Sequence, residues 1–289
     1  MYVLNWKNHR LPLGSRTLIM GIVNVTPDSF SDGGRFHAAD AALAQAEHLA
    51  EAGADIIDIG GESTRPYADD VPAEEEIRRV VPVIERLNGH IGVPISIDTT
   101  KAEVAEAAIE AGASIINDIA ALQMDPAIAE TAARHGVPVI LMHMKGTPRT
   151  MQIDPTYDDV VREVRDFLDD AINRAVTSGI EREKIIVDPG IGFGKTRRHN
   201  LLLLQRLEEL TDLNVPILVG PSRKRFIRDL VKSSAEKDIA PDRPEVEAGT
   251  QAAIAAAVLK GADMVRVHDV ARTKPTVALC DAIKKASGD

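Results

Sequence analysis

The chain has 289 residues, of which 44% are hydrophobic and 27% are charged, as is ordinary for a soluble globular protein. Its formal net charge of −10 argues against a nucleic-acid-binding protein, because such proteins usually carry a basic stripe. Aromatic residues make up only 3%, so Ala, Val, Ile and Leu must build the core.

Cysteine usage and the N-terminal segment indicate the compartment. Cys280 is the only cysteine, so no disulfide can form within the chain, which fits a reducing cytoplasm. The segment MYVLNWKNHRLPLG lacks an apolar signal core, and no apolar run of ~20 residues occurs in the sequence. We therefore expect a cytoplasmic protein that binds neither a membrane nor nucleic acid.

Short apolar segments alternate with Ala- and Glu-rich segments from residue 18 onward. The apolar segments are too short for helices and fit strands that are buried on both faces, and several follow a glycine that ends a helix. The predicted strands lie in 18–25, 53–61, 93–98, 112–119, 137–143, 184–190, 215–220 and 261–269. The predicted helices lie near 38–52, 73–88, 101–111, 127–135, 157–178, 198–211, 244–260 and 273–286.

Eight strand-then-helix units predict an α/β fold, a (β/α)8 TIM barrel, as a single domain over residues 1–289. A doubly wound open sheet is the alternative. That fold would favour G-x-G-x-x-G after the first strand, and the sequence lacks it there. In a barrel, the active site forms at the C-terminal ends of the strands.

Polar residues stand at those strand ends. In chain order they are Asn24, Asp58 with Glu62, Asp98, Asn117, Met142 with His143, Asp188, Ser222 with Lys224, and Arg266 with His268. Asn117 and Arg266 fall at the same offset from a repeated glycine, which predicts a similar depth in the barrel. For one residue, such as Asp118 or Ser222, helix capping explains the pattern equally well. For the whole set, a binding site is the better explanation.

The residue types indicate what this site binds. Asp98, Asn117 and Asp188 suit a flat heterocycle rich in N–H donors, such as an aminopyrimidinone. Asn24 either helps to hold an anion or holds a metal that bridges to a phosphate. The residues that offer positive charge for an anion are Lys224, Arg266, His268 and Arg65.

The segment DPGIGFGKT at 188–196 ends like a phosphate-binding P-loop. A P-loop has four residues between its first glycine and GK[ST], whereas Gly190 and Gly194 enclose three and Pro189 prevents a shifted frame. We therefore exclude a P-loop. We expect the glycines to let the backbone pass close to a ligand, with Phe193 as an apolar wall; a Gly-rich turn around a buried Phe is the alternative.

Two long polar segments, TPDSFSDGGRF at 26–36 and STRPYADDVP at 63–72, are typical of functional loops. Both follow early strands, so both can close over one mouth of the barrel. We expect them to be mobile lids.

Eight motifs, in order along nearly the whole chain, resemble the dihydropteroate synthase family. They are MGIVNVTPDSFSDGG (20–34), GGESTRP (60–66), ISIDTTK (95–101), IIND (115–118), LMHMKGTP (141–148), DPGIGFGK (188–195), GPSRKRFI (220–227) and RVHDV (266–270). One departure is Tyr67, where the family usually has Gly.

The resemblance implies an enzyme of folate synthesis and a sulfonamide target. It would join 6-hydroxymethyl-7,8-dihydropterin pyrophosphate to p-aminobenzoate with Mg2+ as cofactor, by an SN1-like C–O cleavage.

The implied pterin residues are Asp98, Asn117, Met142, Asp188, Lys224 and Arg266. The implied p-aminobenzoate residues are Phe30, Thr64, Arg65, Pro66 and Phe193, with Lys224. Pyrophosphate would be held by Asn24, Arg266 and His268, and Mg2+ by pyrophosphate and Asn24. The catalytic residues would be Asp98, Arg266, His268 and Lys224.

The family is commonly dimeric, so we expect a homodimer. The Ala-rich stretch at 251–259 could support close packing of two helices, although an Ala-rich helix lying on the barrel would look the same.

Three other functions remain possible. A pterin-binding methyltransferase domain would share the barrel but would not need DSFSDGG, SRK or RVHD. A metal-dependent hydrolase would favour His-x-His at the first strand, where the chain has Asn24 in Val-Asn-Val. A catalytically silent paralogue would bind pterin without turnover, and Tyr67 is its only sequence indication.

Overall fold

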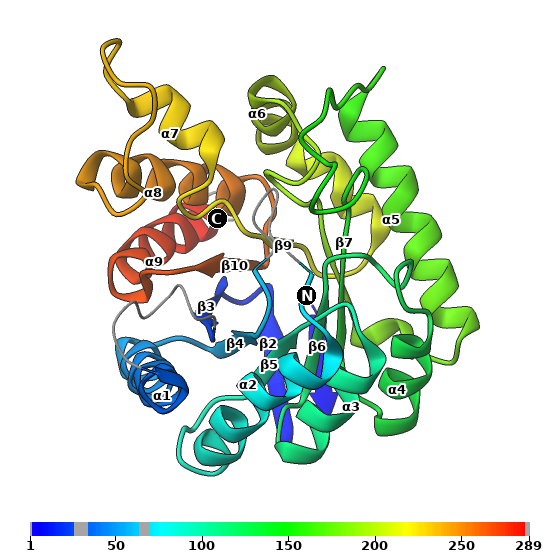
Figure 1. Ribbon diagram of the computed structural model, residues 1–289. Helices are drawn as coiled ribbons and strands as arrows, with labels where there is room; N and C mark the ends of the chain where they lie inside the picture. Colours follow the sequence, from blue (N-terminus) through cyan, green and yellow to red (C-terminus); the bar gives the residue numbers. More distant parts are fainter. Residues whose placement is uncertain (1, 26–33, 64–69, 287–289) are drawn as a thin grey trace.

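Eight parallel strands form the centre of the molecule, and helices surround them (Figure 1). The computed structural model describes residues 2–25, 34–63 and 70–286. The strands pair in the order β8-β7-β6-β5-β4-β3-β10-β9, and a parallel bridge between Val187 and Ile217 joins the two edges. The predicted (β/α)8 barrel is therefore confirmed. The strands are β3 (Leu18–Asn24), β4 (Ile56–Gly60), β5 (Ile95–Asp98), β6 (Ile115–Asp118), β7 (Val139–Met142), β8 (Ile185–Asp188), β9 (Leu218–Val219) and β10 (Met264–Val267).

All eight predicted helical segments are helical, and one of them is divided into two helices. The segment predicted at 198–211 contains α6 and a 3-10 helix, η3, because Arg206 leaves the α-region with φ −111° and ψ 24°. Leu207, Leu210 and Leu213 then face the core at the three-residue repeat of a 3-10 helix. The helices are α1 (Gly34–Ala52), α2 (Ala73–Leu87), α3 (Ala102–Ala111), α4 (Ala127–His135), α5 (Val160–Thr177), α6 (Arg197–Gln205), α7 (Arg225–Val231), α8 (Pro244–Leu259) and α9 (Val270–Ala286), with 3-10 helices η2 (Arg182–Lys184) and η3 (Leu207–Leu213).

The 3-10 helix η2, a short helix and a hairpin were not predicted from the sequence. Short helix α7 follows the SRK motif, and an antiparallel hairpin of β1 (Tyr2–Trp6) and β2 (His9–Leu13) precedes the barrel. The hairpin buries Leu4 and Trp6 on one face by strand alternation. It lies against η2, which leads into the start of β8, so it covers the barrel end opposite the C-terminal strand ends.

Apart from Asn24 in β3 and Arg266 in β10, every residue of the eight strands is buried, as the apolar segments predicted. Parallel strands bring all their C-terminal ends to one edge, so the polar residue that ends each apolar run reaches the same mouth. No helix within the described ranges is long and apolar enough to cross a membrane.

The glycines of the β8 loop are required by contact between two loops. Gly190 has φ +67°, and a Cβ there would lie 1.8 Å from the carbonyl oxygen of His143. Gly194 has φ +62°, and a Cβ there would lie 2.6 Å from the carbonyl oxygen of Lys145. At these two positions the β8 loop backbone therefore lies close to the β7 loop. This contact agrees with the alternative interpretation of the segment as a Gly-rich turn. Phe193 between them is half-buried.

We predict that Gly190→Ala destabilises the protein by roughly 3 kcal/mol, because Ala adds both a clash and a strained positive φ. Urea unfolding followed by circular dichroism measures this difference. Gly92→Ala is the matched control, since a Cβ at that exposed glycine meets nothing within 4 Å. Equal stability of the two variants would contradict the loop-contact explanation.

Candidate active site

Arg266 links three strands across the barrel mouth, and Asn117 adds a fourth strand to the network. From β10, its Nε donates to Asp58 Oδ2 on β4 at 2.6 Å, and its second terminal nitrogen donates to Asp98 Oδ2 on β5 at 2.6 Å. Asn117 on β6 donates from Nδ2 to the same Asp58 oxygen at 3.1 Å. Both carboxylates are buried, so Arg266 supplies the positive charge that such groups need inside a protein.

Asp58 was noted at a strand end in the sequence but was not assigned a role. The sequence did contain a signal for such a role. Asp58, Asn117 and Arg266 each stand five residues after the repeated glycine of GAD or GAS. The same offset places them at a depth where their side chains bond to one another.

The charged groups shift one another's pKa. Burial raises the pKa of the Asp98 carboxyl, and Asp58, Glu76 and Asp118 raise it further, while Arg266 opposes the rise. Burial works to lower the pKa of Arg266, but Asp58 and Asp98 raise it above its ordinary value. Arg266 therefore stays charged, whereas a proton on Asp98 is held more tightly than on an exposed carboxyl.

Three buried acceptors at the mouth have no hydrogen-bond donor within the described part of the chain. They are Asp58 Oδ1, Asp98 Oδ1 and Ser96 Oγ. Buried polar atoms in folded proteins are almost always paired. An unpaired carboxylate oxygen needs an N–H or O–H donor, so Asp98 Oδ1 suits a ligand that donates N–H groups.

The opposite wall combines a carboxylate, a cation and an aromatic ring. Asp188 ends β8, is buried, and accepts from the Gly190 amide at 2.7 Å. Lys224, just before α7, donates from Nζ to the carbonyl of Ile191, and this Nζ lies 4.4 Å from the centre of the Phe193 ring. Burial lowers the pKa of Lys224 to about 8, although Asp188 acts to raise it. Burial likewise raises the pKa of Asp188.

Met142 provides an apolar surface between these groups. It ends β7 and packs in a small cluster with Ile119, Met144 and Met151, and Phe193 packs against the cluster. An apolar surface beside carboxylates, an amide and a lysine is the usual composition of a pocket for a small flat ligand.

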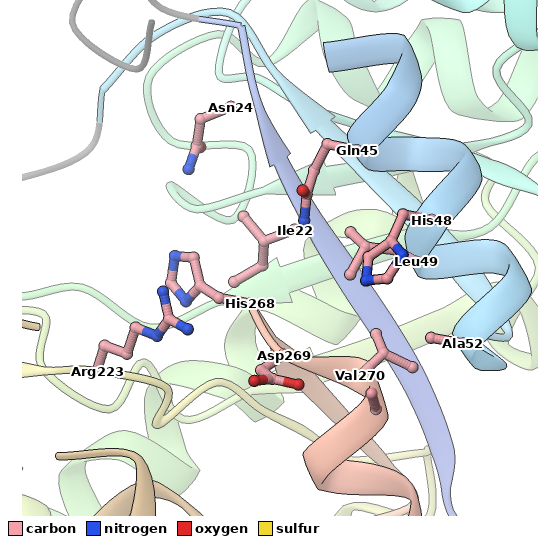
Figure 2. Close-up of a pocket in the computed structure, with 11 residues that line it drawn as sticks. Ile22, Asn24, Gln45, His48, Leu49, Ala52, Arg223, His268, Asp269 and Val270 are labelled. Atoms are coloured by element: carbon pink, nitrogen blue, oxygen red, sulfur yellow. The ribbon is translucent and has the colours of Figure 1, made fainter. Parts of the chain in front are cut away.

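A cleft of about 410 Å³ adjoins the mouth between α1 and the start of α9. Asn24 and His268, the two residues predicted to hold pyrophosphate with Arg266, both line it, together with Arg223. Figure 2 shows the Arg223 and His268 side chains extending toward one another, with Asn24 on the neighbouring strand end. Ser222 Oγ lies 2.9 Å from His268 Nδ1, which orients the ring.

Four predicted site residues, Phe30, Thr64, Arg65 and Pro66, lie outside the described residues, as do Tyr67 and most of both predicted lids.

The two ends of the second lid segment are nevertheless tied together. Glu62 accepts from the Val71 amide at 3.1 Å and from Lys101 Nζ, and Lys101 also pairs with the fully buried Glu76 at 2.7 Å. Sequence reasoning missed Lys101 and Glu76, because no local pattern marks a pair that meets only in the fold.

The comparisons with known proteins agree with this geometry. Residues 20–268 match the family of pterin binding enzymes. A dihydropteroate synthase of Synechocystis is 47% identical over 270 residues, which cover 93% of this chain and 91% of that protein. A Xanthomonas albilineans dihydropteroate synthase structure with 4-aminobenzoic acid has a TM-score of 0.86 and 48% identity, and covers 95% of each chain. A second structure of that enzyme, with 7,8-dihydropteroate, has a TM-score of 0.86 and 45% identity over 98% of each chain.

The barrel mouth brings together carboxylates, an amide and an arginine, and the chain matches these relatives over most of its length. Together these findings define the class of protein. The chain belongs to the family of pterin-binding enzymes. Its relatives within that family are dihydropteroate synthases, so the predicted resemblance is confirmed.

We predict that replacing Arg266 by Met raises the pKa of both Asp98 and Lys224. Arg266 stabilises the ionised Asp98 carboxylate, so its loss raises that pKa further; it also repels the protonated Lys224, so its loss moves the lysine pKa upward from about 8. Titration of 13C-labelled carboxyl and lysine Cε groups by NMR measures both values. A fall in either pKa would contradict the electrostatic account.

Proposed function

We propose that the chain condenses 6-hydroxymethyl-7,8-dihydropterin pyrophosphate with p-aminobenzoate to give 7,8-dihydropteroate and pyrophosphate. The observation that carries this proposal is the Arg266 bridge between Asp58 and Asp98, which leaves one buried, unpaired acceptor oxygen on each carboxylate. The relatives bound to 4-aminobenzoic acid and to 7,8-dihydropteroate support it.

The pterin ring suits the mouth because it is flat and rich in N–H donors. Asp98, Asn117 and Asp188 accept those donors, and the Asn117 amide also donates to a ring oxygen. Lys224 donates a hydrogen bond to an acceptor atom of the pterin ring, and Met142 offers an apolar surface against the ring. Arg266 stacks on the ring through the face of its guanidinium.

We infer that the C–O bond to pyrophosphate breaks before the amine attacks. Arg266 and His268 stabilise the departing anion, and Asp98 stabilises the cationic pterin that remains. The neutral amine of p-aminobenzoate, bound beside Phe193 and Lys224, then attacks the cation, and the proton that the amine loses passes to the released pyrophosphate. A neutral aromatic amine is a competent nucleophile, so the mechanism needs no dedicated strong base.

We also propose Mg2+ as the cofactor. Among the described residues no group of three His, Cys, Asp or Glu side chains is placed to hold a metal ion, so the chain itself offers few ligands there. Mg2+ is commonly bound by one or two protein oxygens plus substrate phosphates. The Asn24 amide oxygen lines the cleft beside His268 and fits this role. Bound Mg2+ would neutralise charge on pyrophosphate.

The direct test incubates the protein with both substrates and quantifies dihydropteroate and pyrophosphate together. We expect equal amounts of the two products with Mg2+, and loss of most turnover when EDTA removes the metal. Pterin binding without turnover would instead indicate a catalytically silent paralogue. Full activity in EDTA would refute the metal proposal alone.

We predict that Asp98→Asn lowers kcat by roughly 100-fold, because the amide cannot neutralise a cation, while the Kd for the pterin substrate changes by less than about threefold. Steady-state kinetics and calorimetry measure the two effects. Asp118→Asn is the matched control: its carboxylate is also buried at the mouth but accepts from the Ala120 and Leu122 amides. If only KM rose in Asp98→Asn, its cation-stabilising role would be wrong.

We propose that the enzyme is a homodimer. Ala253 and Ala257 are buried, so the Ala-rich stretch packs on the barrel itself. Leu259, Leu279 and Ile283 on α8 and α9 remain exposed, and they offer an apolar surface for a second copy. Light scattering should give twice the 31.2 kDa chain mass, and Leu279→Glu should reduce it. A monomeric wild-type protein would contradict this proposal.

A further inference from the structure

Lys195 ends the DPGIGFGK motif and lies inside the protein. It is 3% exposed, and its Nζ donates to the Phe193 carbonyl at 2.9 Å and to His143 Nδ1 at 2.8 Å, with the His143 carbonyl at 3.4 Å. An ammonium has three donors, so these partners account for all of them. Lys195 therefore differs from a P-loop lysine, which reaches out to phosphate.

His143 is the acceptor that makes this arrangement possible. Burial lowers the pKa of the His143 imidazole, and the charge of Lys195 lowers it further, so the ring is neutral and its Nδ1 accepts. The ring packs edge-on against Phe167 at 4.7 Å between ring centres. His143 is thus a structural hydrogen-bonding residue.

Three consecutive carbonyls of the β8 loop each accept from a different side chain. Gln152 donates to Gly192 O at 2.8 Å, Lys195 donates to Phe193 O at 2.9 Å, and Tyr157 donates to Gly194 O at 2.8 Å. Gln152 and Tyr157 come from the segment after β7, and Lys195 reaches His143 at the end of β7. The loop that carries Phe193 is therefore fixed to its neighbour.

Lys195 is the one of these three donors that holds Phe193 itself and also faces the charged wall of the site. Burial is the largest effect on the pKa of Lys195 and lowers it. Asp188 acts to raise this pKa, and the charge of Lys224 acts to lower it. The Phe193 ring in turn lies 4.4 Å from Lys224 Nζ. A shift of the Phe193 backbone would change this spacing.

We propose that Lys195 is a positioning residue for the p-aminobenzoate subsite, holding the Phe193 ring at its distance from Lys224. This inference rests on the proposed function. Lys195 touches no substrate; it acts through the Phe193 carbonyl and the β7 loop. The subsite geometry therefore depends on a lysine that sequence reasoning had considered only for phosphate binding.

The test compares Lys195→Met with wild type. We expect KM for p-aminobenzoate to rise roughly tenfold, with kcat changed less than about threefold and the Kd for dihydropterin pyrophosphate unchanged. Tyr157→Phe is the matched control, because it removes a bond to the adjacent carbonyl only. Equal rises in KM for both variants, or no rise in Lys195→Met, would overturn the proposal.

A double-mutant cycle with Phe193→Leu tests the route of the effect. If Lys195 acts through Phe193, then Lys195→Met adds no further rise in KM in that background, whereas additive rises would contradict this route. If Lys195→Met does not fold, Lys195→Gln replaces it. Gln keeps an N–H donor but is shorter and uncharged, so we expect a smaller rise in KM for p-aminobenzoate, and no rise would overturn the proposal. A wild-type protein that forms no dihydropteroate would refute the proposed function instead, so the two failures are distinguishable.

Discussion

The bond of Arg266 to two buried carboxylates is the interaction on which the site depends. Isolated charges are costly to bury, and a pair is tolerated only with good geometry and additional hydrogen bonds. Arg266 meets this condition with two bonds of 2.6 Å, and Asn117 supplies a second donor to Asp58. The fixed positive charge keeps Asp58 and Asp98 together at the mouth, and each retains one unpaired oxygen. The binding surface is thus organised before any ligand arrives.

The barrel makes this arrangement possible because it separates stability from chemistry. Apolar strands, buried throughout, form the core, while the residue that ends each strand is free to be polar. Loop contacts then fix the individual groups. Lys195 holds the β8 loop and Phe193, and Lys101 joins Glu62 at the base of the second lid segment to buried Glu76. In both cases a charged side chain ties together segments that are distant in the sequence.

Much of the fold could be predicted because the relevant signals are local. Glycine at helix ends and short apolar runs marked all eight barrel strands, and the polar ends of those runs marked Asp98, Asn117 and Asp188. Features that depend on contacts between residues distant in the sequence could not be predicted. Lys195 and its partner His143 are 52 residues apart, and no local pattern shows that the lysine points inward. The β1–β2 hairpin was also not predicted, although its strands pair locally from Tyr2–Leu13 to Trp6–His9.

The most direct test of the central claim is a crystal structure with the dihydropterin pyrophosphate substrate or a non-hydrolysable analogue. We expect ring N–H groups within hydrogen-bond distance of Asp98 Oδ1 and Asp188, with Arg266 alongside the ring and the phosphates in the cleft between Asn24 and His268. A ring bound elsewhere, with Asp98 Oδ1 still lacking a donor, would contradict the account.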